Sequence, residues 1–179
     1  MATPAFKEWA VIVHALLEGE QILDVRKGGL HEDGRRFGLQ ATRVWLYPTA
    51  EHQDPELLKP AYRSTIDLAA GSPVGQPIRI DGWADIVGTA TITEPEQLDA
   101  LDSKLIWTQE YAESRMHWKK RQPLWVLAMR VHRLAEPLEV PWRRTTAGAR
   151  RGWISKAYLP IRRRCRPSSL CPMSPSTRV

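Results

Sequence analysis

Residues 78–93 read IRIDGWADIVGTATIT, and this stretch decides the fold class. Its even-numbered positions are apolar or small, whereas its odd-numbered positions, apart from Trp83 and Val87, are polar or charged. Such alternation is typical of a β-strand with one buried face. The stretch exceeds the ordinary strand length of about 5–6 residues, so Gly82 and Gly88 are predicted to be bends or bulges.

The segments on either side predict further strands and several helices. Helical spacing of apolar residues predicts a helix over residues 6–17, with Thr3 placed to cap it and Gly19 just past its end. A capping box that starts at Thr93 and a further start at Thr108 predict two more helices. Strands are predicted at residues 21–27, 43–47 and 124–134, and Pro137 and Pro141 are expected to end the ordered structure.

The order of these elements is helix, strands, helices, strand. It lacks the regular alternation of strands and helices that marks a doubly wound parallel sheet. A long strand bent at glycines suits a curved antiparallel sheet. The chain is therefore predicted to be an α+β protein, with a curved, mainly antiparallel sheet or small open barrel and three main helices.

Charge divides the chain at Arg143. Residues 1–142 hold 16 of the 26 Lys and Arg residues and all 20 Asp and Glu residues, so their net charge is −4. Residues 143–179 carry the other ten basic residues and a charge of +10. We expect residues 1–142 to form a single globular domain and residues 143–179 to be a basic, disordered tail. The whole-chain charge of +6 is then no measure of the domain's surface.

Several classes of protein are excluded or disfavoured by composition. No run approaches the roughly 20 apolar residues of a membrane span, and the N-terminus lacks a signal-peptide pattern. A cytoplasmic protein without a membrane partner is therefore expected. Both cysteines, Cys165 and Cys171, lie in the tail, so a catalytic thiol in the domain is excluded. No cofactor or metal site is predicted.

Five spaced blocks carry a family resemblance: KEWA (7–10), RKGG (26–29), LYPT (46–49) with HQ (52–53), WK (118–119), and PL (123–124) with RV (130–131). Together they resemble the bacterial domain of unknown function 1802 family over residues 6–142. The resemblance implies no established activity. Some members resemble partners of restriction endonuclease domains, which implies an association with nucleic acid. The segment LEGEQI (17–22) followed by Arg26 is also similar to the opening of small β-barrel domains of pseudouridine synthases and archaeosine transglycosylases, which bind RNA or modified bases.

The tail departs from this family, whose members are expected to continue with Pro-Asp/Glu-Tyr-Gly-Gly-Cys. If residues 143–149 are written as CGC CGG ACT ACG GCG GGT GC, reading from the third base gives Pro-Asp-Tyr-Gly-Gly-Cys. A single deleted nucleotide would account for the whole tail. Our hypothesis is that the tail is a frameshift product, and resequencing of the gene tests it.

The first candidate contact with nucleic acid is Arg26, Lys27, Gly28 and Gly29. Two cations at a strand end, next to glycines that let a backbone N–H approach an anion, suit a phosphate contact. The alternative is a solvated strand end before a turn.

The second candidate contact comprises Tyr47, His52 and Gln53. Their hydroxyl, imidazole and amide groups could read base edges from a loop. A proline-fixed turn whose polar side chains satisfy the backbone is the alternative.

The third candidate contact follows one helix and comprises Tyr111, Arg115, Trp118 and Lys119. Spacings of four, three and one can place aromatic and basic groups on one side, where they would stack a base and hold a phosphate. The alternative is a row of core-facing aromatic residues with a solvated rim.

No set of catalytic residues is predicted, and a non-enzymatic role is favoured. Asp85 with Asp102 and Lys104 is the best nuclease-like set, but Asp102 and Lys104 lie near a predicted helix end and not on the strand that a metal-dependent core needs. The interpretation is a non-catalytic module that recognises RNA or a modified or single-stranded DNA feature, as an accessory to a restriction, defence or processing system. A metal-dependent nuclease or other hydrolase, and a protein–protein interaction module, are the alternatives.

Overall fold

The computed structural model describes residues 4–26, 32–33, 36–37, 42–51, 53–68, 75–117, 123–142 and 152–154. None of the helices in these ranges combines the length and apolar character needed to cross a membrane. The elements follow in this order along the chain: β1 (Ala5–Trp9), α1 (Ala10–Glu18), β2 (Leu23–Arg26), β3 (Glu32–Asp33), β4 (Arg36–Phe37), β5 (Arg43–Thr49), η1 (Pro55–Leu57), η2 (Pro60–Tyr62), α2 (Thr65–Leu68), β6 (Ile78–Ile92), α3 (Pro95–Asp99), η3 (Asp102–Lys104), α4 (Gln109–His117), β7 (Leu124–Val140) and β8 (Gly152–Ile154).

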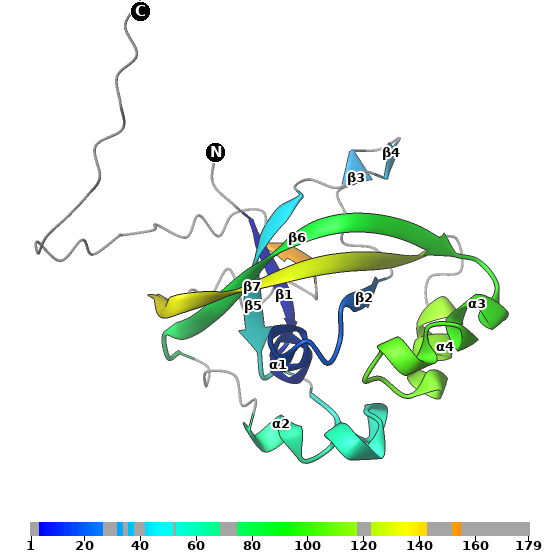
Figure 1. Ribbon diagram of the computed structural model, residues 1–179, viewed down its shortest axis with the longest axis horizontal. Helices are drawn as coiled ribbons and strands as arrows, with labels where there is room; N and C mark the ends of the chain where they lie inside the picture. Colours follow the sequence, from blue (N-terminus) through cyan, green and yellow to red (C-terminus); the bar gives the residue numbers. More distant parts are fainter. Residues whose placement is uncertain are drawn as a thin grey trace, which may run out of the picture.

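Six of the described strands form one curved sheet in the order β2-β7-β6-β5-β1-β8. β1 and β5 run parallel, and every other neighbouring pair in this sheet is antiparallel. The sheet is open, with β2 and β8 at its edges. Figure 1 shows α1 beneath the arch of β6 and β7, with α3 and α4 at one end of that pair. The predicted α+β class with a curved, mainly antiparallel sheet is confirmed.

The main core lies between α1 and the inner face of the sheet. Large apolar side chains from β1, α1 and β5 are almost fully buried there, among them Phe6, Trp9, Ile12, Leu16 and Leu46. Each side chain of this size contributes about 1.5–3 kcal/mol when it is removed from water. This packing fixes the junction between β1 and α1 against the sheet.

The predicted N-terminal helix is wrong in its first half. Residues Ala5–Trp9 form β1, and α1 begins only at Ala10, although it ends before Gly19 as predicted. β1 lies between β5 and β8, and all five of its residues are buried. A strand buried on both faces shows no alternation, so the spacing of Phe6 and Trp9 imitates a helix.

The predicted bends in the long strand are confirmed at both glycines. The register between β6 and β7 shifts between Ile80 and Gly82, and again between Ile86 and Gly88. A Cβ atom at Gly82 would lie 2.6 Å from the backbone oxygen of His132. The absence of a side chain at Gly82 therefore lets the two strands approach where the sheet bends.

Pro137 does not end the ordered structure, because β7 continues to Val140. Ile80 pairs with Leu138 and Gly82 with Arg133, so extra β7 residues, including Pro137, lie within this irregularity of the ladder. A proline is tolerated at a bulge because its missing N–H removes no regular ladder hydrogen bond. The sequence rule that proline ends a strand fails here for that reason.

The two later helices begin close to their predicted starts. Thr108 caps α4, since its hydroxyl accepts a hydrogen bond from the Tyr111 backbone N–H at 3.2 Å. The capping box of α3 is shifted by one residue, from Thr93 to Glu94, with Gln97 as its reciprocal partner. The prediction of a capping box at this helix start is correct, but the box begins one residue later than predicted.

Candidate functional site

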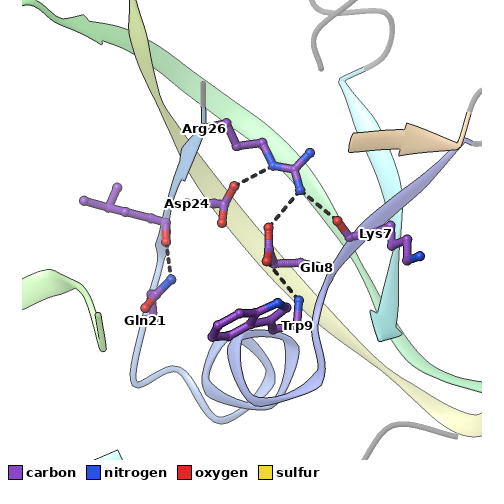
Figure 2. A network of polar contacts seen from close by, with 7 residues as sticks. Lys7, Glu8, Trp9, Gln21, Asp24 and Arg26 are labelled. Atoms are coloured by element: carbon purple, nitrogen blue, oxygen red, sulfur yellow. Dashed lines mark hydrogen bonds and ion pairs between the residues drawn. The ribbon is translucent and has the colours of Figure 1, made fainter. Parts of the chain in front are cut away.

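A buried set of charged side chains connects β1 to β2, two strands that are not neighbours in the sheet. Nη2 of Arg26 donates to the backbone oxygen of Lys7 and to Oε2 of Glu8, both at 2.8 Å. Nε of Arg26 donates to Oδ2 of Asp24 at 3.0 Å. Figure 2 shows the guanidinium held between these groups. We call Lys7, Glu8, Asp24 and Arg26 the β1–β2 network.

All four members of the β1–β2 network are buried, and Arg26 is only 3% exposed. Burial opposes the charge of Arg26, but the neighbouring carboxylates of Asp24 and Glu8 outweigh it, so the pKa of Arg26 lies above its ordinary value. The ring of Phe6 adds a cation–π contact, with its centroid 3.8 Å from Cζ of Arg26. The alternative of a solvated strand end is therefore wrong for Arg26.

One nitrogen of this guanidinium, Nη1, takes part in none of these hydrogen bonds. Among the described residues, the buried Nη1 of Arg26 has no hydrogen-bond partner. A buried donor without an acceptor costs about 1–3 kcal/mol. Nη1 of Arg26 is therefore a donor that the described residues leave unsatisfied.

The start of α1 orients Glu8 within the network. Oε1 of Glu8 accepts a hydrogen bond from the Trp9 backbone N–H at 2.9 Å, directly before the first turn of α1. A carboxylate is favoured at this end of a helix by the helix dipole. Both oxygens of Glu8 are thus engaged, one by the helix start and one by Arg26.

Gln21 supports the other side of the network. Its Nε2 donates to the backbone oxygen of Leu23 at 2.7 Å, and its Oε1 accepts from the Ile106 backbone N–H at 2.9 Å. The side chain therefore fixes the turn into β2 against the segment before α4. Leu23 and Val25 alternate with Asp24 and Arg26 along β2, and the two charged residues are the more deeply buried.

Tyr47 and Gln53 lie near β1 and α1. Tyr47 is buried and stands opposite Lys7 in the parallel ladder of β1 and β5. Gln53 accepts a hydrogen bond at Oε1 from the Val11 backbone N–H at 3.0 Å, which caps the first turn of α1. Their predicted role in reading bases stays a prediction.

We expect Gln53→Ala to lower the free energy of unfolding by about 1 kcal/mol, because the Val11 N–H loses its acceptor. Gln53→Glu keeps an oxygen in the same place and adds a negative charge at the helix start, so it should retain or raise the stability. Urea unfolding of both variants checks this. Equal losses in the two variants would contradict the capping role.

The third candidate contact is partly assembled on α4. Cζ of Arg115 lies 5.9 Å from the centroid of the Tyr111 ring, so the two side chains share a side of the helix. Tyr111 also packs against the core, with ring centroids 4.5 Å from Trp107 and 6.4 Å from Trp9. Six of the predicted contact residues lie outside the described residues: Lys27, Gly28, Gly29, His52, Trp118 and Lys119.

The described candidates therefore gather around the junction of β1 and α1. Arg26 contacts Lys7 and Glu8, Gln53 contacts Val11, and Tyr111 packs against Trp9. Lys7, Glu8 and Asp24 were not among the predicted site residues. The sequence signal that could have indicated them is the charged pair Lys7 and Glu8 in the KEWA block. Charged residues between apolar residues of a buried segment are rare unless they have partners.

Asp85, the best nuclease-like residue in the sequence, is bound to an arginine. Nε and Nη2 of Arg43 donate to its two carboxylate oxygens at 2.8 and 3.1 Å. These hydrogen bonds from Arg43 lower the pKa of Asp85. Asp102 pairs instead with Lys59 at 3.0 Å. The residues that the structure describes contain no group of three or more His, Cys, Asp or Glu side chains placed to hold a metal ion.

Known structures include similar folds at low identity. The ASCH protein from Zymomonas mobilis is 12% identical, with a TM-score of 0.48, over 85% of this chain and 85% of that chain. A serine-to-alanine variant of the same protein is 14% identical, with a TM-score of 0.48, over 76% of this chain and 73% of that chain. Curated proteins gave no match.

A family model matches residues 5–159, which include every block of the family resemblance. The match also contains β8 and continues past the predicted domain boundary at Trp142. That boundary and the frameshift origin of the tail stay predictions. Since the matched range covers well over half of the chain, this protein belongs to the family described as domain of unknown function (DUF1802).

Proposed function

We propose that this protein is a non-catalytic module that recognises nucleic acid, either RNA or a modified or single-stranded DNA feature. The observation that supports this most directly is the buried Nη1 of Arg26 in the β1–β2 network, which has no hydrogen-bond partner within the described part of the chain. Phosphate oxygens and the carbonyl or ring-nitrogen acceptors of bases are the acceptors that arginine binds in nucleic acids.

The surroundings of Arg26 favour recognition over non-specific attraction. Asp24, Glu8 and the backbone of Lys7 fix the guanidinium, so little side-chain entropy is lost when a ligand binds. The chain continues from Arg26 with Lys27, Gly28 and Gly29, which supply a second cation and small residues for close approach. With a charge of −4 on residues 1–142, contacts to phosphates must be few and local.

The family resemblance supports a narrower role. We propose that the module acts in the cytoplasm as an accessory to a restriction, defence or processing system. A restriction endonuclease-type protein is the proposed partner. Co-purification of such a protein from the native host, and its loss in an Arg26 variant, would test this narrower role.

The main test measures binding of the full chain to labelled single-stranded RNA, single-stranded DNA, and unmodified and methylated duplex DNA by fluorescence anisotropy. We expect one of these classes to bind without Mg²⁺, with a shallow dependence on salt. Arg26→Lys keeps the charge but loses the planar fork of donors, so affinity should fall about tenfold or more. Arg133→Lys is the matched control, since Arg133 is an exposed arginine paired with Glu18.

Thermal unfolding separates lost binding from lost folding. A bound oligonucleotide should raise the midpoint of the wild-type protein as its concentration rises. No binding and no stabilisation with any oligonucleotide would overturn the proposal. Mg²⁺-dependent cleavage that disappears in Asp85→Asn would favour the nuclease alternative instead.

A further inference from the structure

A second cluster of polar and aromatic side chains lies on the opposite face of the sheet from α1. Cζ of Arg43 lies 4.0 Å from the centroid of the Trp83 ring. The rings of Trp83 and His132 are stacked, with centroids 3.9 Å apart and an interplanar angle of 13°. We call Arg43, Trp83 and His132 the outer-face stack.

The strands place these three residues side by side. Val44 and Ala84 face each other in the ladder of β5 and β6 and are fully buried. Because side chains alternate along a strand, Arg43 and Trp83 point to the other face. Trp83 is paired with His132 in the ladder of β6 and β7, so the stack spans three adjacent strands.

The guanidinium of Arg43 is held by Asp85 and remains accessible. Asp85 binds it through two hydrogen bonds while its Cζ lies over the Trp83 ring. The side chain of Arg43 is nevertheless 56% exposed, and that of His132 is 38% exposed. Planar groups fixed in this way present a surface on which another planar group can stack without further ordering.

The charge around the stack suits an anionic strand. Arg43 already neutralises Asp85, and Arg130, an exposed residue, stands opposite Asp85 in the ladder. Arg130 therefore adds positive charge beside an aromatic surface. Elsewhere on β6, the exposed Arg79 is paired with Asp81 at 2.8 Å, and no ring contact accompanies it among the described residues.

We propose that the outer-face stack is a second contact surface for single-stranded nucleic acid. A base stacks on the guanidinium of Arg43 or the imidazole of His132, and Arg130 contacts an adjacent phosphate. This inference rests on the proposed function but uses residues on the face away from the β1–β2 network. Single-stranded substrates fit because their bases are free to stack, whereas those of a duplex are not.

The test measures binding of the full chain to labelled twelve-nucleotide oligo-uridine and oligo-thymidine by fluorescence anisotropy. Trp83→Leu removes the ring against which the guanidinium of Arg43 and the imidazole of His132 lie, so it should weaken binding about tenfold, an effect of the size of one stacked base. Arg43→Gln should also weaken it, whereas Arg79→Gln, which removes the same charge from another exposed ion pair, should leave it unchanged. If Trp83→Leu fails to fold, His132→Gln, at a half-exposed position, tests the stack in its place, and it should also weaken binding.

The outcomes separate this inference from the proposed function. Equal losses of affinity in Arg43→Gln and Arg79→Gln would mean that general charge, and not the outer-face stack, determines binding. That result would overturn the inference. Unchanged affinity in the stack variants, with weaker binding by Arg26→Lys, would overturn the inference and leave the proposed function standing. The same holds if the stack variants alter only self-association in sedimentation, which would make the face a protein contact. If the wild-type protein binds no oligonucleotide, both proposals fail.

Discussion

Arg26→Met is expected to lower the free energy of unfolding by about 3–5 kcal/mol, because it leaves two buried carboxylates without their cation. Glu8 and Asp24 are each at most 3% exposed, and both pair with this guanidinium. Natural domains have only about 5–15 kcal/mol of stability, so the loss should be a large part of the total. Urea unfolding at neutral pH measures it.

A matched control and a double variant identify the cause. Arg79→Met removes an exposed arginine that is also paired with an aspartate, and it should cost no more than about 1 kcal/mol. Glu8→Gln combined with Arg26→Met should cost less than the sum of the two single changes, because it also removes one of the carboxylate charges that Arg26 pairs with. Strict additivity, or equal costs for Arg26→Met and Arg79→Met, would reject the β1–β2 network as an interacting unit.

Gly82→Ala should be the second most damaging change, with an expected loss of about 1–3 kcal/mol. Its Cβ atom would lie 2.6 Å from both the His132 backbone oxygen and Cδ2 of Leu17. The end of the leucine side chain can rotate away, but the backbone oxygen is fixed by the sheet. The strands must therefore separate at the bend, and thermal or urea unfolding would record the cost.

Gly88→Ala provides the control within the same strand. The nearest atom to its added Cβ would be the Cβ of Ala128 at 3.7 Å, an ordinary contact. We expect this variant to be neutral, or up to about 1 kcal/mol more stable through the lower entropy of the unfolded chain. Similar losses at both glycines would mean that backbone freedom, and not the close approach at Gly82, is what the fold requires.

The fold could be predicted where one face of an element is buried and the other is not. β6 shows that alternation, and its two glycines marked the register shifts correctly. β1 could not be predicted in this way because burial of both faces removes the alternation. The prediction that Pro137 ends the ordered structure failed for a different reason. Tolerance of a proline within a strand depends on a bulge formed with residues distant in sequence.

The candidate site could be predicted only in part from the sequence. Arg26 could be selected as a cation next to glycines, but its burial depends on the carboxylate of Glu8, contributed by another strand. Tyr111 and Arg115 could be paired by helical spacing, and the structure places them together. The cap that Gln53 provides joins residues 42 positions apart, and no local pattern encodes such a contact.

The link between β2 and β1 also constrains how the sequence of this protein can change. Arg26 carries the positive charge that pairs with both Glu8 and Asp24 in a buried space, so substitution of Arg26 alone removes the cation from both carboxylates, whereas substitution of one carboxylate leaves an ion pair. A lineage can therefore exchange the group for apolar residues only through coordinated replacements, or through an unstable intermediate. Relatives that lack the arginine should differ at the acidic positions too, and the three sites would be inherited as a unit.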